Sequence, residues 1–228
     1  MKPENTKANR VINTFTGHWE KKILPQIARA LPRFVVPDHL TILGVISALA
    51  IFIGYILTRF SIYWIWLSNF GLIIHWFADS LDGTLARVRH IERENYGYFV
   101  DHICDAVTVF MVCVGLGLSP LMDLRVALYL AVAYLMLNVY AHIAAYSEKI
   151  FKLSYGKFGP TEVRIVLFII NIVVIFWNPV VFYLFGHPLT AMDVAGIIVA
   201  TTFMVIFAIA SIKDAIKLDR EDRAKWNE

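Results

Sequence analysis

The sequence has little charge and few cysteines, and each shortage narrows the class of protein. Only 17% of its 228 residues are charged and the formal net charge is +3, which is too small for a nucleic-acid-binding domain. The two cysteines, Cys104 and Cys113, have a spacing that suits neither a zinc site nor a disulfide framework. The sequence also lacks the pattern of a signal peptide and any internal repeat. We therefore expect neither a secreted disulfide scaffold nor a partner of nucleic acid.

Hydrophobic residues make up 58% of the chain, and they gather in long runs. A transmembrane helix needs about 20 mainly apolar residues. By this measure the sequence predicts six spans, at roughly Leu40–Leu57, Ile62–Ala78, Tyr98–Leu118, Val126–Tyr146, Val163–Phe185 and Val194–Ile212. The predicted fold is all-α and integral to the membrane, with a six-transmembrane-helix bundle forming one catalytic domain over residues 37–212.

The placement of lysine and arginine predicts the orientation of the bundle. If the N-terminus is cytoplasmic, nineteen of the 21 basic residues fall on the inner side, and only Arg59 and Arg125 fall outside. The sequence therefore predicts a cytoplasmic N-terminal segment, residues 1–36, and a cytoplasmic tail, residues 213–228. Apolar residues in the N-terminal segment recur at helical spacing, which predicts an amphipathic helix lying on the lipid surface. A helix that simply covers the bundle is the alternative.

Four aspartates interrupt the second and third apolar runs. Asp79 and Asp82 are three residues apart, and Asp101 and Asp105 are four apart, so each pair shares one face of a helix. The link between the two runs, from Val88 to Asn95, is short. We therefore expect antiparallel neighbouring helices whose acidic faces meet.

Carboxylates within a span need compensating charge. An Asp at the centre of a span costs about 2.5–3.5 kcal/mol, and Arg87 alone cannot neutralise four of them. Mg²⁺ and Mn²⁺ prefer carboxylate and water oxygens, and two such ions would balance four negative charges. Two ions about 3.5–4 Å apart are a known means of stabilising the oxygens in phosphoryl transfer. We expect a centre for two Mg²⁺ or Mn²⁺ ions.

These residues also match a family pattern. Their spacing resembles the signature of the CDP-alcohol phosphotransferases, with every fixed position present: Asp79-x-x-Asp82-Gly83-x-x-Ala86-Arg87, then nine residues, then Gly97-x-x-x-Asp101-x-x-x-Asp105. Just before the first span, Pro37-Asp38-x-x-Thr41 resembles a second motif of that family. The resemblance extends over the chain in outline, because the family is a six-span bundle preceded by an interfacial helix.

The resemblance implies an enzyme of phospholipid biosynthesis. Such an enzyme transfers a substituted phosphate group from a CDP-linked donor to an alcohol and releases CMP. The resemblance implies that Asp79 and Asp101 contact both metals, that Asp82 and Asp105 each complete one site, and that Asp105 deprotonates the alcohol. It assigns the CDP site to Asp38, Thr41, Gly83, Ala86, Arg87 and Gly97. It also suggests a homodimer, which no residue pattern shows.

Polar residues around the start of the fifth span are candidates for the acceptor or for a substrate phosphate: Lys152, Lys157, Glu162 and Arg164. The alternative is that they only reflect inner-side topology and a helix start after Gly159-Pro160. Histidines on the motif helices and their neighbour, His75, His102 and His142, are expected to be satisfied interior residues.

The substrate is indicated less sharply than the metal centre. Gly159-Pro160-Thr161-Glu162 resembles the choline and ethanolamine branch of the family, whereas the Pro37 motif resembles the phosphatidylinositol-phosphate branch. We expect CDP-diacylglycerol as donor, with a choline- or ethanolamine-type transfer or a non-catalytic metal or nucleotide-lipid binder as alternatives. An ion relay in a transporter would need acidic residues through the full membrane depth, and the outer halves of the spans are apolar.

Overall fold

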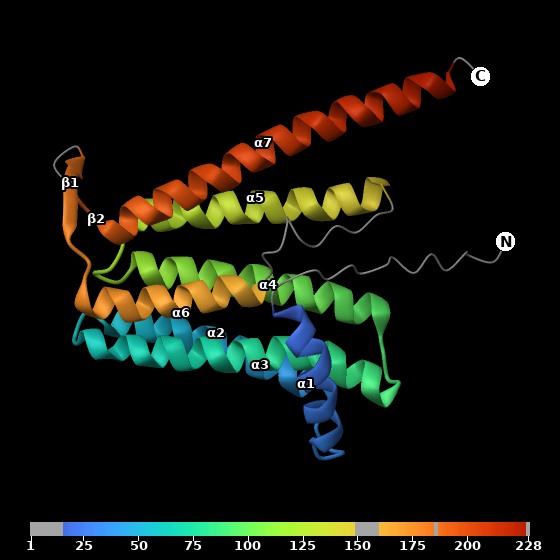
Figure 1. Ribbon diagram of the computed structural model, residues 1–228, viewed down its shortest axis with the longest axis horizontal. Coiled ribbons are helices and arrows are strands. Elements are labelled where there is room, and N and C mark those ends of the chain that lie inside the picture. The colour runs from blue at the N-terminus through green and yellow to red at the C-terminus, as the bar shows by residue number, and fades with distance from the viewer. Residues whose placement is uncertain (1–15, 149–159, 185–186, 227–228) are drawn as a thin grey trace.

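The computed structural model describes residues 16–148, 160–184 and 187–226, and this part of the chain is almost entirely helical (Figure 1). The helices are α1 Gly17–Ala30, α2 Pro37–Leu57, α3 Ile65–Arg89, α4 Glu94–Gly117, α5 Leu124–Glu148, α6 Pro160–Phe176 and α7 Ala191–Lys225. A short 3₁₀ helix, Ile62–Trp64, precedes α3. Two antiparallel strands, β1 Val180–Leu184 and β2 His187–Thr190, form a hairpin between α6 and α7.

The long helices form a bundle around α2, α3 and α4. Helix α2 packs against α3 and α4, α5 packs against α4 and α7, and α6 packs against α3. Figure 1 shows the β1–β2 hairpin at one end of the bundle, which we call the hairpin end. The opposite end, where α3 passes into α4, is the motif end. Helix α1 crosses the side of the bundle toward the motif end.

Among the described residues, four helices are long and apolar enough to cross a membrane: α2, α4, α7 and the Leu124–Ala144 part of α5. Helix α3 has 25 residues but carries several polar side chains, and α6 has only 17, fewer than the roughly 20 that a span needs. The structure thus has the all-α architecture of a multi-pass membrane protein. The count of six spans remains a prediction.

The expected fifth span, Val163–Phe185, is wrong in its second half. Helix α6 ends at Phe176, and Val180–Leu184 forms strand β1, which pairs with β2. Pro179 lacks a backbone N–H and ends the helical pattern, and the following β-branched and aromatic residues suit strands. The Asn178 side chain fixes this exit, because it donates to the Leu121 carbonyl at 3.1 Å and accepts from the Met192 amide at 3.2 Å.

Helix α7 is longer than the expected sixth span. It starts with a capping box, in which Asp193 N donates to Thr190 Oγ1 at 3.2 Å and Thr190 N donates to Asp193 Oδ2 at 2.8 Å. It then continues to Lys225, through most of the segment expected as a tail. An ion pair one turn apart, Arg223 with Asp219 at 2.9 Å, supports this exposed extension.

Helix α1 uses part of its apolar stripe to pack on the bundle. Leu24 and Ala28 are buried against α2 and α3, where they contact a cluster that includes Leu81 and Leu85. Trp19, in contrast, is 70% exposed. The middle of the stripe therefore covers the bundle, as the alternative interpretation expects, and a position of α1 on the lipid surface remains a prediction.

The connection from α1 to α2 is fixed by Arg89, the last residue of α3. Its guanidinium donates to the carbonyls of Leu31 and Pro32, both at 2.9 Å, and to that of Val35. A planar guanidinium with five donors can satisfy several backbone carbonyls at once. The motif helix thereby sets where α2 begins.

A buried polar chain joins three helices on the hairpin side of the aspartates. Tyr55 on α2 donates to Asn171 Oδ1 on α6 at 3.0 Å, and Asn171 Nδ2 donates to Asn69 Oδ1 on α3 at 2.7 Å. All three side chains are buried. Because such groups must find partners in an apolar interior, this chain fixes the register of α6 against α2 and α3.

Candidate active site

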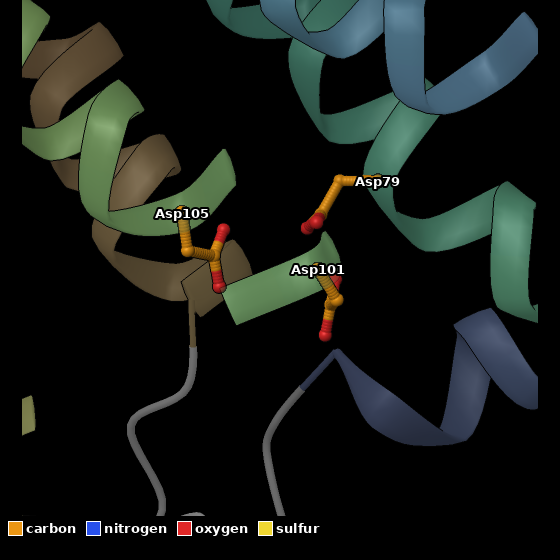
Figure 2. A group of neighbouring side chains, drawn as sticks. All are labelled: Asp79, Asp101 and Asp105. Carbon is orange, nitrogen blue, oxygen red and sulfur yellow. The ribbon is translucent and has the colours of Figure 1, made fainter. Parts of the chain in front are cut away.

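Three aspartates from two helices converge near the motif end. One carboxylate oxygen each from Asp79, Asp101 and Asp105 lies within 4.8 Å of the others. Figure 2 shows Asp79, from α3, facing Asp105 and Asp101, from α4. The helical spacing that put Asp101 and Asp105 on one face therefore brings both to Asp79.

A tight reversal between α3 and α4 makes this convergence possible. His90, directly after α3, has a φ of 55° and so adopts the left-handed conformation that often ends a helix. The Ile91 amide donates back to the Ala86 carbonyl at 3.0 Å, which closes the helix end. Helix α4 begins at Glu94, so the two acidic faces are neighbours.

The fourth aspartate, Asp82, borders the same space without joining the group of three. Its Oδ2 accepts from Thr41 Oγ1 of α2 at 3.0 Å, and its Oδ1 accepts from the Gly83 amide at 2.5 Å. The four aspartates and Thr41 line one cavity of about 20 Å³, together with Leu40, Gly44, Val45, His75 and Cys104. We call this space the carboxylate cavity.

Arg164 supplies a cation to the cluster from α6. Its Nη2 lies 2.8 Å from Asp79 Oδ2, and both side chains are largely shielded, at 14% and 23% exposure. Its Nη1 is buried and has no hydrogen-bond partner in the described part of the chain. From the sequence, Arg164 is a candidate only for contact with a substrate phosphate, and in the structure it also contacts the motif.

The other residues expected at the CDP site surround the cavity at different distances. Asp38 forms an exposed ion pair with Arg93, whose guanidinium lies 4.1 Å from the centre of the Tyr96 ring. Gly97 is exposed, and a Cβ there would meet no atom within 4 Å. Ala86 is half-buried. The structure brings Thr41, but not Asp38 or Gly97, into contact with the carboxylate cavity.

Arg87 turns toward a second, more open cavity of about 330 Å³ between α1 and the end of α3. It donates to Thr84 Oγ1 at 3.1 Å, and a Cβ at Gly83 would meet its Nη1 at 3.4 Å. Pro25, Arg29, Thr84, Val88 and His90 complete the lining of this larger cavity. None of the four aspartates lines it, in contrast to the smaller carboxylate cavity.

Glu162 is buried and faces α1. Its Oε1 accepts from the Thr16 amide at 3.0 Å and from Thr16 Oγ1 at 2.9 Å. A second set of hydrogen bonds has its acceptor on α1. Thr161 Oγ1 donates to Glu20 Oε1 at 2.7 Å, and Trp76 Nε1 of α3 donates to the same oxygen at 3.0 Å. These contacts join the starts of α1 and α6, and we call them the α1–α6 junction.

No sequence pattern predicts this junction, because its partners are 146 and 141 positions apart. The remaining acceptor candidates, Lys152 and Lys157, lie outside the described residues.

The three histidines have different environments. His102 and His142 lie side by side, with ring centres 4.3 Å apart, and Tyr98 Oη lies 2.9 Å from His142 Nδ1. His75 is 4% exposed, and its Nε2 lies 3.0 Å from Thr108 Oγ1. Nδ1 of His75, in contrast, has no hydrogen-bond partner in the described part of the chain.

The carboxylate cluster fits a divalent cation. Mg²⁺ holds oxygens at about 2.0–2.1 Å in an octahedron, so two ligands of one ion lie about 2.9 Å apart when adjacent and about 4.2 Å apart when opposite. The three carboxylate oxygens all lie within 4.8 Å of one another, so an inward movement of the side chains would bring them to one ion. Oxygen is also the donor type that Mg²⁺ and Mn²⁺ prefer.

The described residues form a helical bundle of the multi-pass membrane class, with a carboxylate cluster between two of its helices. The chain matches the family model described as CDP-alcohol phosphatidyltransferase over residues 34–208, which is more than half of its length. It therefore belongs to this enzyme family, which transfers a phosphoryl-linked group from a CDP-alcohol, and the resemblance seen in the sequence is confirmed. No curated protein matches the chain.

Proposed function

We propose that this protein transfers a phosphatidyl group from CDP-diacylglycerol to an alcohol and releases CMP, using two Mg²⁺ or Mn²⁺ ions. The observation that carries the proposal is the convergence of Asp79, Asp101 and Asp105 within 4.8 Å, beside a cavity that Asp82 also lines. Asp79 and Asp101 would contact both ions, and Asp82 and Asp105 would each complete one site. When bound, the ions supply positive charge to the phosphate oxygens and to the leaving CMP.

The chain's own residues perform the remaining tasks. Asp105 accepts the proton of the alcohol hydroxyl as the alcohol oxygen bonds to the phosphorus that carries diacylglycerol. The bond from that phosphorus to the bridging oxygen breaks, and CMP leaves with the electron pair. Arg164 holds Asp79 with one nitrogen, and its Nη1, which has no partner among the described residues, can donate to a phosphate oxygen. Thr41 orients Asp82 through its hydroxyl.

The CDP site extends from the carboxylate cavity toward the motif end. Gly83 offers the donor a backbone without a side chain, and Arg87, which covers Gly83, has the planar fork that pairs with a phosphate. Ala86, Gly97 and Asp38 lie around this approach. Asp38 would exchange its exposed contact with Arg93 for a donor group.

A lipid on the donor is favoured over a lipid acceptor by two contacts. The Pro37 motif starts α2 and places Thr41 on Asp82. Glu162 belongs to the segment that resembles the choline and ethanolamine branch. Its Oε1 already accepts two hydrogen bonds from Thr16, which disfavours a contact with an acceptor. The charge bias further supports a cytoplasmic active site, with residues 37–212 as the catalytic domain and segments 1–36 and 213–228 on the same side.

Purified protein incubated with each donor in turn tests the proposal. The donors are CDP-diacylglycerol, CDP-choline and CDP-ethanolamine, each offered soluble alcohols, alcohol phosphates and diacylglycerol, with CMP as the readout. We expect CMP only from CDP-diacylglycerol, its loss on chelation, and its loss in Asp101→Asn but not in the control Asp219→Asn, an exposed residue of the α7 extension. Normal turnover in Asp101→Asn would contradict the proposal. Retained Mn²⁺ binding without CMP from any donor would favour a non-catalytic binder.

A further inference from the structure

His75 forms the floor of the carboxylate cavity. It lies one helical turn before Asp79 on α3, and it lines the cavity together with the four aspartates. Its partner Thr108 lies on α4, one turn after Asp105. The His75–Thr108 pair therefore joins the same two helices as the aspartates, one turn farther toward the hairpin end.

The two ring nitrogens of His75 are in different situations. Nε2 is 3.0 Å from Thr108 Oγ1, whereas Nδ1 is buried and without a partner in the described part of the chain. Leaving a buried polar atom unsatisfied costs about 1–3 kcal/mol, so such an atom usually has a solvent or ligand partner. The carboxylate cavity, at about 20 Å³, is large enough for a water molecule, which needs roughly 10–15 Å³.

His75 lies outside the group of atoms placed to bind an ion directly. The described atoms within 4.8 Å of one another are carboxylate oxygens of Asp79, Asp101 and Asp105, with no nitrogen of His75 among them. Mg²⁺ and Mn²⁺ also prefer oxygen and keep several waters. When Nε2–H donates to Thr108, Nδ1 carries a lone pair and acts as an acceptor.

We propose that His75 is a positioning residue whose Nδ1 accepts a hydrogen bond from a water molecule of the cation site, and so fixes that water at the floor of the cavity. The inference rests on the proposed metal centre and assigns His75 a role in it that the aspartate motif does not include. Residues that orient the ligands of a metal typically contribute about 10–100-fold to its affinity.

Two amide substitutions separate the two nitrogens. His75→Asn places a polar atom as far from the backbone as Nδ1 but gives up Thr108, whereas His75→Gln reaches to the position of Nε2 but leaves nothing at Nδ1. The readout is the Mn²⁺ dissociation constant of the purified protein, from the electron paramagnetic resonance signal of unbound Mn²⁺. We expect the Mn²⁺ dissociation constant to rise by about tenfold or more in His75→Gln and His75→Leu, and to stay within about threefold of wild type in His75→Asn.

Further variants keep the result interpretable. Thr108→Val removes the partner of Nε2 while Nδ1 stays, so its Mn²⁺ affinity should also stay within about threefold of wild type. His18→Gln, at an exposed position of α1, is the matched control for the substitution itself. Melting temperatures in chelator identify variants that have not folded, and Thr108→Val decides the question if the His75 variants do not fold.

The opposite ranking of Mn²⁺ affinities among the variants would overturn the inference. If His75 only joined α3 to α4, His75→Gln would bind Mn²⁺ like wild type, and His75→Asn and Thr108→Val would lose affinity together. The proposed function fails separately: wild-type protein that binds no Mn²⁺ contradicts the metal centre itself, whereas wild-type binding with unchanged affinity in His75→Gln and His75→Leu contradicts only the role of His75.

Discussion

Arg164 Nη2 on α6 lies 2.8 Å from Asp79 Oδ2 on α3, so a helix distant in sequence supplies a cation to the aspartate motif. The contact is shielded from solvent at both ends, and it gives Asp79 a counter-charge when no ion is bound. In the proposed metal centre, the arginine and a divalent cation would therefore have overlapping roles at the same carboxylate.

Replacing Arg164 by methionine should destabilise the protein most when metal is absent. The change leaves Asp79 shielded and uncompensated, and breaking a shielded ion pair from one side costs about 3–5 kcal/mol. We expect a loss of this order in the free energy of unfolding in chelator, and a clearly smaller loss in saturating Mg²⁺, because the ion supplies the missing charge. Arg125→Met, at an exposed pair with Asp123, should change little in either condition. An equal loss for Arg164→Met with and without Mg²⁺ would show that the pair is unrelated to an ion site.

Thr41 should matter through its hydroxyl rather than its methyl group. Thr41→Val removes the 3.0 Å hydrogen bond to Asp82, and a hydrogen bond to a charged group contributes about 1.5–3 kcal/mol. We expect Mn²⁺ affinity to fall by about tenfold in Thr41→Val and to stay near wild type in Thr41→Ser. Thr202→Val is the control, because the Thr202 hydroxyl donates to the Ile198 carbonyl of its own helix α7. Equal behaviour of Thr41→Val and Thr41→Ser would rule out orientation of Asp82 by the hydroxyl.

Breaking the α1–α6 junction should release α1 without unfolding the bundle. Glu162→Ala removes both contacts with Thr16, and trypsin can cleave at the exposed Lys21 and Lys22 only when α1 opens locally. Because 1.4 kcal/mol corresponds to a factor of ten, we expect cleavage there to be at least about tenfold faster. Glu221→Ala, in the exposed extension of α7, should leave the cleavage rate unchanged. A rate for Glu162→Ala equal to wild type would mean that packing of Leu24 and Ala28 alone holds the helix.

The Tyr55–Asn171–Asn69 chain should contribute to stability as a coupled unit. Asn171→Leu removes two hydrogen bonds and leaves the Tyr55 hydroxyl and Asn69 without their partner. We therefore expect the free energy of unfolding in detergent to fall by about 1–3 kcal/mol. In a cycle with Tyr55→Phe, the two changes should be non-additive by about 0.5–1.5 kcal/mol. Tyr63→Phe, at an exposed tyrosine, provides the reference for losing a hydroxyl. Strict additivity would mean that the tyrosine and the asparagine act independently.

The local part of the site is legible in the sequence, because helical periodicity and a short link determine which side chains face each other. Asp101 and Asp105 share a face because they are four residues apart on one helix, and the short connection His90–Arg93 makes α3 and α4 neighbours. Contacts between distant segments are not legible in this way. Nothing in the spacing of Arg164 or Glu162 indicates whether each meets substrate, Asp79 or Thr16, since that depends on the register of α6.

Hydropathy alone also does not predict where an apolar run passes from a helix into a strand. The stretch from Trp177 to Tyr183 continues the apolar run of α6, yet Pro179 ends the helix and the β-branched residues after it form strand β1. The stripe of α1 is a similar case: its periodicity predicts an apolar face, but only the three-dimensional arrangement shows that Leu81 and Leu85 cover part of it.

The α1–α6 junction imposes an order on biosynthesis. Thr16 leaves the ribosome early, whereas its partner Glu162 follows 146 positions later, a delay of roughly 7–30 s at the usual rates of translation. Leu24 and Ala28 meet their α3 partners sooner, so α1 docks in two stages, first through leucines and then through the hydrogen bonds to α6. Helix α1 is thus fully held only after α6 has been made, and we expect truncated nascent chains that lack α6 to be more readily cleaved in α1.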